Sequence, residues 1–237
     1  HLFILSFFCM LVPPGLAGAE EEVGFRSLFD GKTLNGWSAP DMRYWSVRDG
    51  AITAESSEAL PCKRNQFLVW QLGTLDDFVL RLKFRITGPP SANSGIQFRS
   101  QIADDGHALG YQADIDRAGT YLGLLYDEHG RGVLAKRGEK TVIGPEGDRQ
   151  TTPLEGEQAK VNLDGWNDYE IMACGPHITL KINGIISAEV IDEEKKQRDL
   201  SGKLALQIHS GPAMTIQFKD IQLKRLPLCG GRKKVVL

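Results

Sequence analysis

The segment GYQADIDR, residues 110–117, carries an amide and two carboxylates at alternate positions. Gln112, Asp114 and Asp116 share one parity, and a tyrosine, an alanine and an isoleucine occupy the other. Successive side chains of a β-strand point to opposite faces, so the three polar groups would line one face while the others enter a core. Carboxylates placed in this way can act as a general base or acid, and together with an amide they can bind hydroxyl groups.

Two other segments have the same kind of polar parity. In NSGIQFRS, Gln97 and Arg99 alternate with an isoleucine and a phenylalanine, and in LALQIHS, Gln207 and His209 alternate with a leucine and an isoleucine. Together these side chains supply donors and acceptors for hydroxyl groups. The outer face of a two-sheet sandwich normally meets water, so a merely solvated face is the alternative interpretation of the same pattern.

The elements that would position these residues are β-strands. Apolar residues recur at every second position in FVLRLKFRI, HITLKI and KLALQI, and Asn183–Gly184 after the second run favours a tight hairpin turn. Only residues 191–199 could form a helical turn or two, and a charged loop accounts for them equally well. A change of parity near Lys219 and Asp220 predicts a β-bulge. We therefore predict an all-β fold, a two-sheet antiparallel β-sandwich.

The composition limits the number of domains and the class of partner. The chain has 237 residues, 41% of them hydrophobic, and a formal net charge of −2. A chain of this length can bury one substantial core, so a single large domain is expected. Because basic residues are not in excess, neither a nucleic acid nor an anionic membrane surface is expected as a partner.

The first 19 residues, HLFILSFFCMLVPPGLAGA, form an apolar run that ends in small residues and precedes three glutamates. This pattern predicts a signal peptide, with a mature chain that begins near Glu20 and is exported to the periplasm or the extracellular space. The run is short and interrupted by prolines, so no membrane insertion of the mature chain is expected. The predicted domain then covers residues 20–227, and a basic tail, residues 228–237, follows it.

Three cysteines, Cys62, Cys174 and Cys229, would remain after removal of the signal peptide. They are too far apart in sequence to indicate a zinc cluster. One disulfide with a spare thiol and three unpaired thiols fit the sequence equally well. No cofactor is expected, although Asp114 with Asp116 would also suit a divalent ion such as calcium.

A set of segments, in order along residues 24–226, resembles the 3-keto-disaccharide hydrolase family, long catalogued as a domain of unknown function. The segments are FRSLFDGKTLNGW, YWSVRDGAI, NSGIQFRS, GYQADID, YLGLLYDE, WNDYEI followed by ING, and GKLALQIHSGPAMTIQFKDIQLKRL. The resemblance implies a jelly-roll sandwich like that of the concanavalin-type lectins and glucanases. It also implies a carbohydrate, a disaccharide or glycoside, as the ligand, bound on the concave sheet.

The glucanases of this fold carry the strand motif E-x-D-x-x-E, and this chain departs from it. Gln112 stands where the first carboxylate would be, which argues against direct nucleophilic displacement at the sugar. Asp114 and Asp116 lie roughly 6.5 to 7 Å apart at Cα on an extended strand. That spacing alone does not distinguish retaining from inverting geometry.

A 3-keto sugar offers another route, because its ketone acidifies the proton on C2. A base can remove this proton, the enolate can expel the C1 substituent, and water can add afterwards. We expect Asp114 or His209 as the base and Arg99 as the group that stabilises the oxyanion. The expected substrate-binding residues are Asn93, Gln97, Gln112, Asp116, Tyr126 and Gln207. The alternative is a noncatalytic, lectin-like carbohydrate-binding module.

Overall fold

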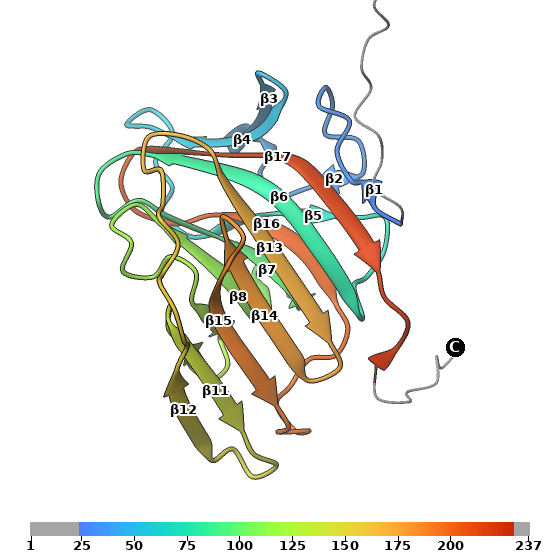
Figure 1. Cartoon of the computed structure of the whole chain (residues 1–237). Coiled ribbons are helices and arrows are strands. Elements are labelled where there is room, and N and C mark those ends of the chain that lie inside the picture. Colours follow the sequence, from blue (N-terminus) through green and yellow to red (C-terminus); the bar gives the residue numbers. More distant parts are fainter. Residues whose placement is uncertain (1–23, 230–237) are drawn as a thin grey trace, which may run out of the picture.

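The computed structural model describes residues 24–229, in which two β-sheets are stacked face to face (Figure 1). The predicted signal peptide and residues 230–237 of the basic tail lie outside the described residues, so export stays a prediction. The helix within residues 24–229 is one short 3₁₀ turn, Met42–Tyr44. Over the same residues, no helix is long and apolar enough to span a bilayer.

The larger sheet has ten strands. Their bounds are β1 (Arg26–Ser27), β3 (Trp45–Arg48), β4 (Ala51–Ser56), β6 (Phe78–Thr87), β11 (Glu139–Ile143), β12 (Arg149–Pro153), β13 (Asn167–Cys174), β14 (His177–Ile182), β15 (Ile185–Asp192) and β17 (Met214–Arg225). The strand order is β12-β11-β15-β14-β13-β6-β17-β4-β3, with β1 also paired to β17. The pairing of β11 with β15 is parallel, and the other pairings of this sheet are antiparallel.

The smaller sheet has seven strands and is antiparallel throughout. Their bounds are β2 (Trp37–Ser38), β5 (Gln66–Trp70), β7 (Asn93–Ile102), β8 (Ala108–Asp116), β9 (Leu125–Glu128), β10 (Gly132–Ala135) and β16 (Lys203–Ile208). The strand order is β10-β9-β8-β7-β16-β5-β2, so strands distant in sequence become neighbours. In particular, β16 lies between β7 and β5.

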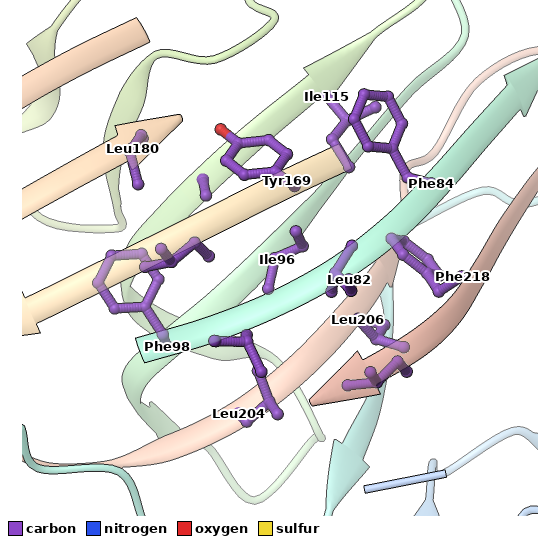
Figure 2. Close-up of a cluster of buried hydrophobic side chains, with 14 of the residues drawn as sticks. Leu82, Phe84, Ile96, Phe98, Ile115, Tyr169, Leu180, Leu204, Leu206 and Phe218 are labelled. Carbon is purple, nitrogen blue, oxygen red and sulfur yellow. The ribbon is translucent and has the colours of Figure 1, made fainter. Parts of the chain in front are cut away.

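The core fills the space between the two sheets, and apolar residues at alternate positions of their central strands contribute to it (Figure 2). In β6, for example, buried apolar residues alternate with half-exposed charged ones, as the period-two pattern predicted. The larger sheet contributes Leu82, Phe84, Tyr169, Leu180 and Phe218, and the smaller one Ile96, Phe98, Ile115, Leu204 and Leu206. The prediction of an all-β, two-sheet sandwich is therefore confirmed.

Local turns follow the residues that permit them. Asn183 and Gly184 both have positive φ, 48° and 81°, as a tight hairpin between β14 and β15 requires. The register of β17 shifts between Lys219 and Gln222, and Asp220 has a φ of 52°, so the predicted bulge is present. The charged segment after β15 forms turns and no helix, which decides between the two interpretations of residues 191–199.

The cysteines form one disulfide and leave one thiol. Cys174 at the end of β13 is bonded to Cys229, which fixes the last described residue to the larger sheet. Cys62 is free and buried, and burial raises the pKa of its thiol to about 11. The thiol is therefore protonated near neutral pH and is a poor nucleophile.

A charge placed in this core should unfold the domain. Leu206 is fully buried on β16 and belongs to the core cluster, so Leu206→Asp would leave an unpaired carboxylate between the sheets. We expect the free energy of unfolding of this variant to be lower than that of the wild type by about 3 kcal/mol or more, as measured by urea denaturation. The matched control, Thr152→Asp at an exposed position of β12, should change the midpoint little. Equal midpoints for the two variants would contradict the assignment of Leu206 to the core.

Candidate functional site

A cavity of about 850 Å³ lies on the outer face of the smaller sheet, the face opposite the core. Residues of β7, β8, β9 and β10 line it, together with the loop before β7, the loop between β8 and β9 and the loop after β16. The lining residues are Pro90, Ser91, Ala92, Asn93, Gln112, Asp114, Asp116, Ala118, Thr120, Tyr121, Tyr126, Glu128, Val133, His209, Ser210, Gly211 and Pro212. Polar side chains from four separate parts of the sequence therefore converge on one site.

The register of the strands explains this convergence. Asn93 on β7 pairs with Asp116 on β8, and the backbone N–H of His209 donates to the carbonyl of Asn93. One step along the face, Gly95 pairs with Asp114 on one side and with Gln207 on the other. Residues that are neighbours across strands lie on the same face of a sheet. The polar side chains of three segments that are distant in sequence therefore form one surface.

Asp114 is the buried carboxylate of the cavity. It is 6% exposed, and its oxygens accept hydrogen bonds from Asn93 Nδ2 at 3.0 Å and from Gln112 Nε2 at 3.3 Å. Burial raises the pKa of Asp114 to about 7, and the nearby charge of Asp116 acts in the same direction, while the two amides act against it. A carboxyl group with this pKa can accept a proton near neutral pH.

Asp116 uses its carboxylate differently. Its two oxygens accept the backbone N–H groups of Thr120 and Tyr121, each at 3.0 Å. The side chain thereby fixes the loop between β8 and β9 that forms one wall of the cavity. Each of its oxygens thus has one backbone donor, and the two carboxylates of Asp114 and Asp116 by themselves offer fewer than the six to eight oxygen ligands that calcium takes.

A chain of side-chain amides extends from Asp114 across the sheet. Gln112 accepts a hydrogen bond from Gln97 Nε2 at 2.9 Å, and Gln97 in turn accepts one from the hydroxyl of Ser100 at 2.7 Å. Gly95 makes room for this chain, since a Cβ at that position would come within 2.5 Å of the Gln112 amide carbon. The side chains of Gln112, Asp114 and Asp116 are therefore packed into a hydrogen-bond network and do not form a merely solvated face.

His209 lines the cavity immediately after β16. Its Nδ1 lies 2.6 Å from the carbonyl oxygen of Ser210, which can only accept a hydrogen bond. Nδ1 must therefore carry the proton, and Nε2 is left as the acceptor of a neutral ring or the second donor of a charged one. His209 and Asp114 are thus on the same sheet and line the same cavity.

Gln207 is fully buried on the outer face of β16, between Gly95 of β7 and Phe67 of β5. Neither atom of its amide has a hydrogen-bond partner among the described residues. An unpaired buried amide costs about 1–3 kcal/mol. Gln207 is not among the residues that line the cavity, so it lies behind the site rather than on its surface.

Arg99 does not reach the cavity, and the expectation that it shares a face with Asp114 is wrong. The register of β7 shifts between Gln97 and Gln101, and Arg99 has a φ of 51°, so the simple alternation ends before this residue. Its guanidinium is fully buried, where it donates to the carbonyl of Gly175 and pairs with Asp77 at 2.8 Å. These partners belong to loops that connect strands, so Arg99 holds connections of the sandwich together.

Two tyrosines and a glutamate complete the cavity. Tyr126 pairs with Gln112 across β8 and β9, which places it on the expected face. Tyr121, in the loop that Asp116 fixes, is 51% exposed and offers an aromatic surface to a ligand. Sequence reasoning did not select Tyr121, although an exposed aromatic residue within a glycine-containing loop is a usable signal. Glu128, the last residue of β9, adds a third carboxylate.

The charge balance of this cavity is distinctive. Its lining contains Asp114, Asp116 and Glu128 but neither lysine nor arginine. A second cavity, of about 760 Å³, lies on the larger sheet. There, Glu170 accepts hydrogen bonds from Arg81 and Lys181, so these three charged groups of the second cavity already pair with one another. The cavity on the smaller sheet is therefore the better candidate for a functional site.

Solved structures share this fold. A candidate glycosyl hydrolase from Parabacteroides distasonis is 19% identical, with a TM-score of 0.56 and coverage of 86% of this chain and 94% of that one. A carbohydrate-binding module from Bacillus subtilis is 14% identical, with a TM-score of 0.53 and coverage of 80% and 95%. A Bacillus subtilis protein of unknown function with a galectin-like fold is 12% identical, with a TM-score of 0.54 and coverage of 81% and 90%.

At these identities the structural matches establish the fold alone, a jelly-roll sandwich. No curated protein matches the chain. The family comparison is more specific, because one family model aligns with residues 24–224, nearly all of the described part. The chain therefore belongs to the 3-keto-disaccharide hydrolase family, whose domain is described as 3-keto-alpha-glucoside-1,2-lyase-like.

Proposed function

We propose that the cavity of the smaller sheet cleaves 3-keto-glycosides, with 3-keto-disaccharides as the substrate class, and that Asp114 is the general base. The observation that carries the proposal is a buried carboxyl group with a pKa of about 7 in a cavity lined by hydroxyl-binding groups. The family membership supports the substrate class and the elimination, since its domain is described as 3-keto-alpha-glucoside-1,2-lyase-like, and a 1,2-lyase removes groups from two adjacent carbons.

The reaction proceeds by elimination. Asp114 takes the proton from C2, and the C–H electron pair moves toward the C3 ketone to form an enolate. When the ketone is restored, these electrons form a double bond between C1 and C2, and the bond from C1 to the leaving oxygen breaks. The leaving oxygen takes up a proton. Addition of water across the double bond, with hydroxide at C1 and a proton at C2, completes a net hydrolysis.

His209 is the residue that we assign to the leaving oxygen. With Nδ1–H held by the Ser210 carbonyl, the charged form of the ring carries its second proton on Nε2, and donation of that proton to the leaving oxygen would return the ring to its neutral form. Asn93 and Gln112 hold the Asp114 carboxylate, and Tyr126 and Tyr121 provide ring surfaces and hydroxyls for the sugar. Aromatic faces and amides are the usual groups of small-ligand sites of this polarity.

A second candidate function is carbohydrate binding without cleavage. The likeness to a carbohydrate-binding module and the exposed ring of Tyr121 favour it. The two functions differ in one measurement, because a binding module retains a 3-keto-disaccharide unchanged. Incubation of the purified protein with such a substrate, followed by chromatography for free monosaccharide, separates them.

Removal of the Asp114 charge should abolish most turnover. Asp114→Asn keeps the size of the side chain but cannot accept the C2 proton, so kcat should fall by at least about 10²-fold while KM changes little. Asp168→Asn is the matched control, because Asp168 is a carboxylate of the other cavity, on the larger sheet. The control should retain full activity. Full activity of Asp114→Asn, or loss only in the control, would exclude Asp114 as the base.

The pH dependence of the reaction should report the same group. Asp114 must be ionised to act as a base, and its pKa is about 7, so kcat/KM should rise with pH through an apparent pKa near that value. The residual activity of Asp114→Asn should lack this transition. A wild-type profile that is flat between pH 5 and 8 (roughly one unit or more on either side of that pKa) would contradict the assignment.

The same pKa predicts how stability depends on pH. Folding raises the pKa of Asp114 from 3.8 to about 7, so the folded state holds a proton that the unfolded state has lost over this window. Stability from this group is present at low pH and is lost as the pH rises toward 7. As the pH rises from 4 to 8, the free energy of unfolding of Asp114→Asn should therefore increase relative to that of the wild type, by on the order of 2–4 kcal/mol in total.

Thermal unfolding at several pH values measures this difference. Asp30 provides a control of opposite sign, because backbone N–H groups of Thr33 and Lys32 lower the pKa of its carboxyl to about 2. Stability from Asp30 is present above the unfolded pKa and is lost in acid, so Asp30→Asn should lose stability relative to wild type as the pH rises from 2 toward 5. A pH-independent difference between Asp114→Asn and wild type would show that Asp114 is not perturbed by burial.

A further inference from the structure

Two histidines and a glutamate meet at the edge of the cavity. His107 directly precedes β8, Glu128 ends β9, and His129 follows it in the turn to β10. The Nε2 atoms of His107 and His129 are 2.8 Å apart, and Glu128 Oε1 lies 3.5 Å from the first and 3.6 Å from the second. We propose that these three side chains bind a divalent transition-metal ion of the Zn²⁺, Co²⁺ and Ni²⁺ type.

The distances fit three ligands of one ion. Ligand atoms about 2.0–2.1 Å from a tetrahedral metal are separated from one another by roughly 3.3 Å, and the edges of this triangle bracket that value. Each residue offers one ligand atom, an imidazole nitrogen or a carboxylate oxygen. Three protein ligands leave at least one coordination position open, which is the arrangement of catalytic rather than structural zinc sites.

Each ligand is held in place by its surroundings. The ring of His107 packs edge-on against Phe67, with ring centroids 5.0 Å apart. His129 has a φ of 57°, a left-handed conformation that is uncommon outside glycine and that brings its ring to His107 at a centroid distance of 4.5 Å. The structure therefore keeps the two imidazoles together before any ion binds.

A buried ion-pair network anchors the turn that carries Glu128 and His129. Arg131, in the turn, donates to Asp127 on β9 at 2.8 Å and to Asp192 at 2.7 Å on the other sheet. Asp192 is fully buried and also accepts a hydrogen bond from Tyr111. The turn is thus fixed to both sheets, which limits the freedom of the two ligands that it carries.

The ligand types select the metal. Two imidazoles and one carboxylate suit borderline divalent ions, whereas calcium and magnesium favour oxygen ligands alone. The electrostatics agree, because the cavity lining that includes Glu128 also contains Asp114 and Asp116 and has no lysine or arginine. The proposed site is distinct from the pair of Asp114 and Asp116, for which the sequence also allowed a divalent ion such as calcium.

A metal at this edge would supply the positive charge that the reaction needs and that Arg99 does not provide. An enolate develops negative charge on the ketone oxygen, and an ion with an open position can stabilise that charge. This use of the metal rests on the proposed function. The existence of the site does not, because it follows from the three side chains alone.

Binding can be measured without any substrate. Tag-free protein, treated with a chelator and dialysed, should bind one equivalent of Co²⁺ and acquire visible absorption bands of a low-coordinate Co²⁺ site. Zn²⁺ should displace the Co²⁺ and remove the bands. Glu128→Gln and His129→Ala should each weaken Co²⁺ binding by roughly 10–100-fold or more. Both residues are partly exposed, so neither change should unfold the protein.

His177→Ala is the matched control, because His177 also pairs with a glutamate, Glu189, at 2.8 Å but lies on the larger sheet. It should leave Co²⁺ binding unchanged. Absence of Co²⁺ binding in the wild type, or equal binding in all variants, would overturn the site. Co²⁺ binding in a protein that never cleaves 3-keto-disaccharides would leave the site standing and reject the proposed function. Turnover that survives complete metal removal would reject the electrophilic role.

Discussion

The cavity depends on one cross-strand pair, Gly95 on β7 opposite Asp114 on β8. A carboxylate can be buried on a sheet only if hydrogen-bond donors reach it and if the opposite strand leaves space. Gly95 leaves that space, the Gln112 amide occupies it, and Asn93 supplies the second donor. A shift of the register by one residue would turn Asp114 into the apolar core, so the chemistry of the site is tied to the pairing that also builds the fold.

The sequence predicts this part of the molecule well, because the apolar residues of the core between the sheets recur at every second position of β8 and β16 and the polar residues stand between them. The apolar parity specifies the core, and the opposite parity then specifies Gln112, Asp114 and Gln207 as outward groups. What the alternation does not specify is the burial of the outward groups. That burial depends on the cross-strand neighbours and on the loop that Asp116 fixes, and neither is visible within a single strand.

The alternation also fails where the backbone leaves the regular strand. Arg99 continues the sequence parity of Gln97, but the bulge between Gln97 and Gln101 sends its guanidinium to Asp77 instead. His107 and His129 belong to no alternating pattern, because both lie in turns next to the ends of strands. Turn residues converge through topology, here the antiparallel pairing of β8 with both β7 and β9, and a search of single segments does not find them.

The charges of the cavity link the base and the proposed metal. Burial without a nearby cation keeps the pKa of Asp114 near 7, and the negative charge of Asp116 contributes in the same direction. A divalent ion held by Glu128 would favour ionisation of the other carboxylates of the cavity, so it would lower the pKa of Asp114. The same ion that accepts charge from the enolate would thus weaken the base that forms it. The distance between the two sites sets the balance, since an ion at the edge of the cavity perturbs Asp114 less than one bound beside it.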